Sequence, residues 1–160
     1  MLVYQCPWTN VKADCVVVTC SDHRFTTATE RFLRILGHDH PHIIKLPGSV
    51  SMSFAQENET ITQLIAFAIN HTGASRVILF GHDQCGAYES VHSPMRIDGA
   101  SNRESMRQVQ QEHLMEYARK LTTEMGITVV TYFAFVDDHG VVSIHDITQS
   151  AYADAQQQAS

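Results

Sequence analysis

Two short segments of the chain carry side chains of the kinds that bind a metal ion. Residues 20–24 read Cys-Ser-Asp-His-Arg, and residues 81–86 read Gly-His-Asp-Gln-Cys-Gly. Thiolates and imidazoles are common zinc ligands, and the spacing of His82 and Cys85 lets two side chains reach one ion. Cys20, His82 and Cys85 are therefore candidate ligands of a zinc ion.

Three ligands leave the fourth position of a tetrahedral zinc site to be assigned. Cys15 precedes Cys20 on the same predicted strand, so we expect it on the opposite face and roughly 17 Å away at about 3.4 Å per residue. No further thiol is then placed to close the site, which favours an open position that holds water, as in catalytic zinc sites. The other possible fourth ligands are Cys6, Asp22, His23 and Asp83.

Asp22 and Arg24 add a carboxylate and a cation beside the first candidate ligand. A zinc ion with two thiolate ligands is a weak Lewis acid, so its water needs help to lose a proton. Asp22 can accept a hydrogen bond from that water, and Arg24 would keep the carboxylate ionised because a nearby cation lowers its pKa. Asp22 could instead bind zinc directly and block the open position, and both arrangements stay open at this stage.

The elements that must position these residues follow from apolar patterns. Short apolar and β-branched runs predict strands at 14–19, 42–46, 76–80, 127–136 and 141–145. Helical spacing predicts helices at 29–36, 57–70 and 101–125 and a short one near Gly86, with acidic residues in the first turn of the second helix. This alternation predicts an α/β fold, a mainly parallel sheet flanked by helices with an antiparallel edge strand.

The strand order decides whether the two segments meet. If the second strand lies outside the first, the order is 2-1-3-4-5, and the direction of winding reverses between the first and third strands. Cys20 ends the first strand and His82 follows the third, so both would lie at the carboxyl ends of neighbouring strands. Open α/β sheets bind their ligands at that crevice.

The two segments together, Cys-x-Asp-x-Arg and His-x-x-Cys-Gly, resemble those of the β-class carbonic anhydrases over residues 16–88, and the strand pair within 127–147 fits the sheet of that family. The resemblance implies reversible hydration of CO2 to bicarbonate and a proton by a homodimer or higher homo-oligomer. It also implies Zn2+ on the three candidate ligands, a dyad beside the metal, and a backbone segment near bound bicarbonate. The residues concerned are Cys20, His82 and Cys85 for the metal, Asp22 and Arg24 for the dyad, and Gly86 for the substrate.

The chain also departs from that family. Its members usually carry an Arg-Asn-Ala-Gly-Asn-like segment after the second strand, whereas residues 45–49 here read Lys-Leu-Pro-Gly-Ser, and His23 stands where a serine is common. These changes can alter the pocket, so two alternatives remain. One is a zinc hydrolase of carbonyl sulfide or carbon disulfide, and the other is a non-catalytic zinc-binding protein.

Length and composition set the remaining expectations. A chain of 160 residues with 44% hydrophobic content fits one domain over 1–160, with an N-terminal arm at 1–12 and a flexible tail at 149–160. A net charge of -6 with scattered Lys and Arg argues against a nucleic-acid partner, and no apolar run approaches the roughly 20 residues of a membrane span. The absence of secretory-signal features near Met1 and the four cysteines favour reduced thiols and a cytoplasmic location. The His-rich stretch at 38–42 is interpreted as a solvated loop, not a second metal site.

Overall fold

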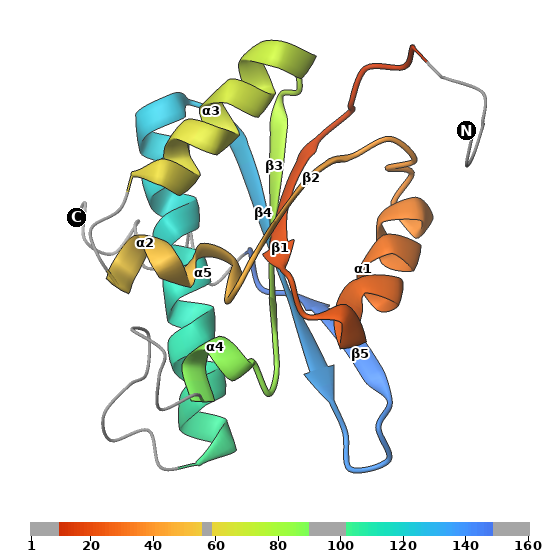
Figure 1. Cartoon of the computed structure of the whole chain (residues 1–160), viewed down its shortest axis with the longest axis vertical. Helices are drawn as coiled ribbons and strands as arrows, with labels where there is room; N and C mark the ends of the chain where they lie inside the picture. Colours follow the sequence, from red (N-terminus) through yellow and green to blue (C-terminus); the bar gives the residue numbers. More distant parts are fainter. Residues whose placement is uncertain (1–9, 56–58, 90–101, 149–160) are drawn as a thin grey trace, which may run out of the picture.

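A five-stranded sheet forms the centre of the computed structural model, which describes residues 10–55, 59–89 and 102–148 (Figure 1). The strand order is β2-β1-β3-β4-β5; the first four strands run parallel, and β5 runs antiparallel to β4. The predicted fold class and strand order are therefore confirmed. The strands are β1 (Val16–Cys20), β2 (His42–Leu46), β3 (Arg76–His82), β4 (Thr128–Val136) and β5 (Val142–Asp146).

Helices cover both faces of this sheet, with α1 on one face and α3 and α5 on the other (Figure 1). Strand β1 shows why its sequence lacks alternation. Val16 and Val18 pack with α3 and α5, whereas Val17 packs with Leu33 of α1, because successive side chains of a strand point to opposite faces. The helices are α1 (His23–Ile35), α2 (Met52–Ala55), α3 (Thr60–Thr72), α4 (Gly86–Glu89) and α5 (Arg103–Met125), with a 3-10 turn η1 (Ser49–Ser51).

The edge of the sheet where β1 and β3 end is the part of the fold that matters for function. These two strands are parallel neighbours, and Cys20 and His82 are their last residues. Helix α5 crosses close to this edge: a Cβ atom added to Gly81 would lie 2.5 Å from Leu114 Cδ1. Glycine therefore lets β3 and α5 approach each other directly beside His82.

Two sequence-based expectations about helix starts are wrong. Helix α1 begins at His23, not residue 29, because Asp22 caps it by accepting a hydrogen bond from the Arg24 N–H. Helix α3 has no acidic residue in its first turn; Glu59 is its N-cap residue and pairs with Lys120 at 2.6 Å.

The turn η1 and helix α2 were not predicted, because residues 49–55 alternate serine with apolar residues and so lack helical spacing. The predictions for residues 1–9, 57–58, 101 and 149–160 lie outside the described residues. Among the helices that the structure describes, none combines the length and the apolar character needed to cross a membrane.

Candidate metal centre

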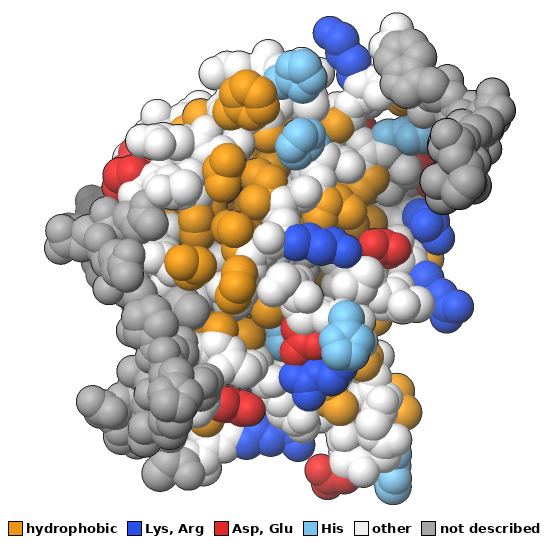
Figure 2. Space-filling view, viewed as in Figure 1, with side chains coloured by type: hydrophobic (Ala, Val, Ile, Leu, Met, Phe, Trp, Pro, Cys, Tyr) orange, Lys and Arg blue, Asp and Glu red, His pale blue; other side chains and the backbone are white. Residues whose placement is uncertain are grey.

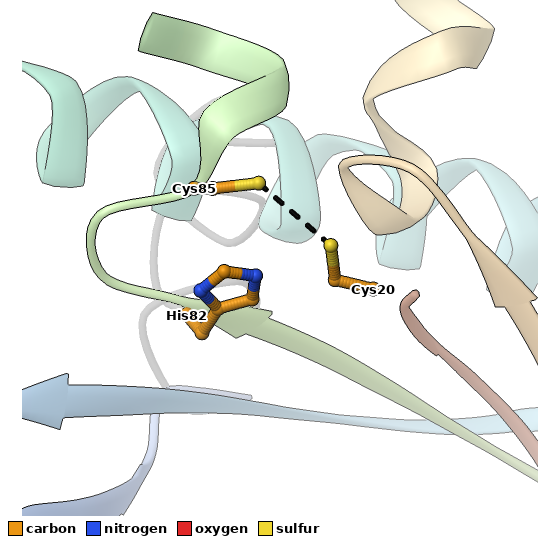
Figure 3. A group of neighbouring side chains, drawn as sticks. All are labelled: Cys20, His82 and Cys85. Atoms are coloured by element: carbon orange, nitrogen blue, oxygen red, sulfur yellow. Dashed lines mark hydrogen bonds between the residues drawn. The ribbon is translucent and has the colours of Figure 1, made fainter. Parts of the chain in front are cut away.

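Three metal-binding side chains meet at the carboxyl edge of β1 and β3 (Figure 3). The donor atoms of Cys20, His82 and Cys85 all lie within 4.8 Å of one another, and all three residues are buried. The two Sγ atoms are 3.8 Å apart. Figure 3 shows both sulfurs and the His82 ring directed toward a common space.

Local structure explains how each side chain reaches this space. Cys20 and His82 end adjacent parallel strands, and Cys85 follows a tight turn that leads into α4. Gln84 has a φ of 52°, a left-handed conformation that is uncommon outside glycine. This turn carries Cys85 back over the strand end, so that its sulfur faces Cys20.

The His82 ring is oriented by two contacts. It stacks on Phe25 of α1, with ring centroids 4.1 Å apart and planes at 28°. Its Nδ1 atom lies 2.7 Å from the Asp83 backbone oxygen, and since a carbonyl only accepts, Nδ1 carries the proton. The Nε2 atom is buried and has no hydrogen-bond partner among the residues that the structure describes. An imidazole held in this way presents a free lone pair to a metal ion.

The two sulfurs form a buried pair that a divalent cation would stabilise. The hydrogen bond between the two sulfurs lowers the pKa of Cys20. The same hydrogen bond, together with burial, raises the pKa of Cys85. The hydrogen-bonded pair thus favours the thiolate at Cys20 and the thiol at Cys85, whereas direct ligation to a cation deprotonates both. The Gly48 N–H also donates to Cys20 Sγ at 3.3 Å. Two thiolates and an imidazole suit zinc, so the donor set fits the ion expected from the sequence.

Asp22 and Arg24 form a close ion pair beside this cluster. The Asp22 carboxylate accepts hydrogen bonds from Arg24 Nε at 3.0 Å and Nη2 at 2.6 Å. Arg24 also donates to the Gln84 backbone oxygen at 2.9 Å, which ties the pair to the turn between His82 and Cys85. These hydrogen bonds from Arg24 lower the pKa of Asp22 to about 2. The carboxylate is thus ionised at neutral pH and engaged with Arg24.

A cavity of 380 Å3 joins the ion pair to the sulfurs. Gly86 lies on its wall, and a Cβ atom added there would meet no atom of the described residues within 4 Å. Pro47 and Gly48, from the segment in which this chain departs from its expected relatives, form another part of the wall. The cavity thus brings together the predicted site residues Cys20, Asp22, Arg24, Cys85 and Gly86.

Two possible fourth ligands do not join the cluster. The Asp83 carboxylate faces Arg103 and Arg107 of α5, at 2.5 Å from each, and is 1% exposed. Burial acts to raise its pKa, but the hydrogen bonds from the two arginines outweigh that effect and hold the pKa at about 2. His23 is exposed on the first turn of α1.

The sequence did not predict several contacts to the site residues and to Asp83, namely those from Phe25, Gly48, Arg103 and Arg107. Only the arginines offered a signal, since residues four apart share one face of a helix.

The remaining cysteines lie elsewhere. Cys15 is fully buried before the first residue of β1 and packs with Val17 and Leu33, away from the cluster as expected. Its Sγ lies within 4.8 Å of donor atoms of Asp14 and His38, and His38 Nδ1 is 2.9 Å from Asp14 Oδ2. Burial raises the pKa of Cys15 to about 12, so it is a neutral thiol. Cys6 lies outside the described residues.

Solved structures with the same fold include carbonic anhydrases, several of them described as β-carbonic anhydrases. They include one of two tetrameric enzymes from Sordaria macrospora, with a TM-score of 0.54 and 17% identity over 86% of this chain and 82% of that chain. The Streptococcus mutans enzyme has a TM-score of 0.56 and 17% identity over the same shares of the two chains, 86% and 82%. The enzyme CafA of Aspergillus fumigatus has a TM-score of 0.55 and 14% identity over 92% and 83%. At these identities the likeness concerns the fold alone.

Sequence comparison supplies the family. No curated protein sequence matches the chain. The family model described as carbonic anhydrase matches residues 15–127, which is more than half of the chain and includes both segments that carry the candidate ligands. With this match the chain belongs to the carbonic anhydrase family, and its fold is the one seen in the β-class enzymes.

Proposed function

We propose that the protein catalyses the reversible hydration of CO2 to bicarbonate and a proton, with zinc held by Cys20, His82 and Cys85. The observation that supports this most is the convergence of these three donors beside the Asp22–Arg24 pair, with both cysteines on the wall of the cavity that the pair lines. When bound, zinc supplies a Lewis acid that lowers the pKa of a water molecule toward neutrality.

In this proposal the other residues orient the reactants. Asp22 Oδ accepts a hydrogen bond from the attacking water and points its lone pair toward CO2. With a pKa of about 2, Asp22 is too weak a base to store the proton at neutral pH, so its role is orientation. Arg24 holds the carboxylate in place, and the open wall at Gly86 leaves room for bicarbonate beside the backbone.

Metal analysis and stopped-flow CO2 hydration test this proposal. We expect about one zinc per chain and a hydration rate that rises between about pH 6 and about pH 9 as the water ionises. Cys85→Ser should lose both zinc and activity. Cys15→Ser is the matched control, because Cys15 is equally buried but lies away from the cluster, and it should keep both. A zinc-loaded protein with a rate equal to that of buffer would contradict the proposal, and hydrogen sulfide release from carbonyl sulfide would favour the alternative substrate.

We further propose that the protein assembles as a homodimer through the face formed by α3 and the edge strand β2. Figure 2 shows hydrophobic side chains gathered on this side of the molecule. Phe67 and Leu64 of α3 are 66% and 40% exposed. We expect Phe67→Glu to yield monomers in sedimentation velocity, whereas Val141→Glu, at an exposed position in the β4–β5 turn, should leave the assembly intact. Dimers that persist in the Phe67 variant would exclude this face.

The proposal of a zinc thiolate site also bears on location and domain organisation. Zinc ligation needs reduced cysteines, which favours the cytoplasm. We treat residues 1–160 as a single domain, which agrees with a sheet whose strands extend from Val16 to Asp146.

A further inference from the structure

In the sequence, Asp83 lies between the candidate zinc ligands His82 and Cys85. Its buried carboxylate nevertheless points away from both. It follows His82 in the chain, and its carboxylate contacts α5, not the metal cluster. Buried charges are costly unless they are fully paired, so the arrangement calls for an explanation beyond the ligand set.

The carboxylate is satisfied on both oxygens. Oδ2 accepts hydrogen bonds from Arg103 Nε at 2.8 Å and Arg103 Nη2 at 2.5 Å, and from Arg107 Nη2 at 2.5 Å. Oδ1 accepts the backbone N–H of Gln84 at 2.9 Å. Both arginines also donate to the Val136 backbone oxygen at the end of β4, which anchors them to the sheet. The side chain of Asp83 is thus held by the first turns of α5.

The backbone of Asp83 is held in place as well, and it is the backbone that contacts the candidate zinc ligand His82. Its N–H donates to the Ala134 backbone oxygen of β4 at 2.9 Å, and its own carbonyl oxygen accepts from His82 Nδ1 at 2.7 Å. That second bond places the proton on Nδ1 and leaves Nε2 free. Contacts from α5 and β4 therefore determine where the carbonyl that orients His82 lies.

We propose that Asp83, clamped by Arg103 and Arg107, is a positioning residue that fixes the tautomer and direction of His82 for metal binding. The inference rests on the proposed zinc site, in which His82 Nε2 is a ligand. Partners of a metal-bound histidine typically change metal affinity by about 10- to 100-fold when they are removed. A purely structural Asp83 would instead hold α5 against the sheet and leave the His82 ring unaffected.

Asp83→Asn tests the proposal, since it keeps the size of the side chain and removes its charge. We expect the zinc dissociation constant to rise by about 10- to 100-fold in a chelator competition. The d–d bands of the Co2+-substituted protein should shift as the geometry relaxes. Leu121→Ala is the control for simple destabilisation, because Leu121 is a fully buried core residue of α5 outside the metal cluster. It should lower the free energy of unfolding without changing either metal readout.

A metal-free measurement separates this inference from the proposed function. Long-range 1H–15N spectra report which ring nitrogen of His82 carries the proton; we expect the Nδ1–H form in the parent and a mixture of tautomers in Asp83→Asn. If Asp83→Asn does not fold, Arg107→Lys is the substitute, because it keeps a cation and leaves Arg103 paired with Asp83. It should raise the zinc dissociation constant and mix the His82 tautomers to a smaller extent. An unchanged tautomer and a zinc dissociation constant within about twofold of the parent would overturn the proposal. Absence of CO2 hydration by the zinc-loaded parent protein would count only against the proposed function.

Discussion

Asp22→Asn is the most informative single substitution, because Asp22 has two roles that this change separates. Its carboxylate pairs with Arg24, and it caps α1 by accepting the Arg24 N–H. Asparagine caps a helix about as well as aspartate, so the substitution removes the charge and keeps the cap. Asp22→Ala, by contrast, removes both.

The expected cost in stability is small. At about 1.4 kcal/mol for each pKa unit, the lowering of the Asp22 pKa from 3.8 to about 2 corresponds to about 2.5 kcal/mol. The Arg24 side chain is 51% exposed, so solvent screening reduces the contribution of the pair to about 1 kcal/mol. Asp22→Asn should therefore lower the free energy of unfolding by about 1 kcal/mol, and Asp22→Ala by about 1 kcal/mol more through the lost cap.

The expected cost in rate is large. Positioned groups that handle protons contribute about 100- to 10,000-fold, so both variants should lose that much in kcat/KM for CO2 hydration while they retain zinc. Because Asp22 titrates near pH 2, its loss should lower the hydration rate by the same factor at every pH between about 6 and about 9. The pH at which the rate rises should not change. A zinc-loaded Asp22→Asn protein with the kcat/KM of the parent would refute the role of the carboxylate.

Two further predictions concern the helix that supports the site. Gly81→Ala should lower the free energy of unfolding by about 1–3 kcal/mol, because the new Cβ atom overlaps Leu114. In a Leu114→Ala background the same substitution should cost less, which urea titrations of the double-mutant cycle would show. Additive costs of the two substitutions would contradict the close approach of β3 and α5. His113 stacks on Phe54, and burial lowers its pKa below 6.5. The unfolded chain then binds a proton more readily than the folded one as the pH falls below about 6.5, so the free energy of unfolding should decrease with acidification. His113→Gln should weaken that decrease. Equal slopes of the free energy of unfolding against pH in both proteins would disprove this prediction.

The location of Asp83 connects the metal centre to the rest of the fold. Arg103 and Arg107 stand at the start of α5, so the same helix that packs on β3 and β4 also holds the turn between two candidate ligands. Changes at these arginines should therefore reach His82 without any contact to the metal.

The sequence alone determined the strands, their mainly parallel arrangement and the identity of the candidate ligands, whereas the strand order was a condition that the structure met. Buried strands such as Val16–Cys20 are recognisable because a short, continuous apolar run is typical of a strand that is covered on both faces. The parallel arrangement follows from the alternation of these strands with helices. The start of α1 was missed because its first turns, from His23 to Ala28, are mostly polar, and the cap at Asp22 was assigned only to chemistry.

Tertiary structure decided what no local pattern contains. Asp83 was a possible ligand in the sequence, and only the packing of α5 shows its charge paired with two arginines. The ring of His82 is oriented by Phe25 and by a backbone carbonyl, contacts that require α1 and β3 to be folded against each other. Sequence spacing specifies which donors can approach one edge of a sheet, but their directions and protonation depend on distant residues that folding brings near.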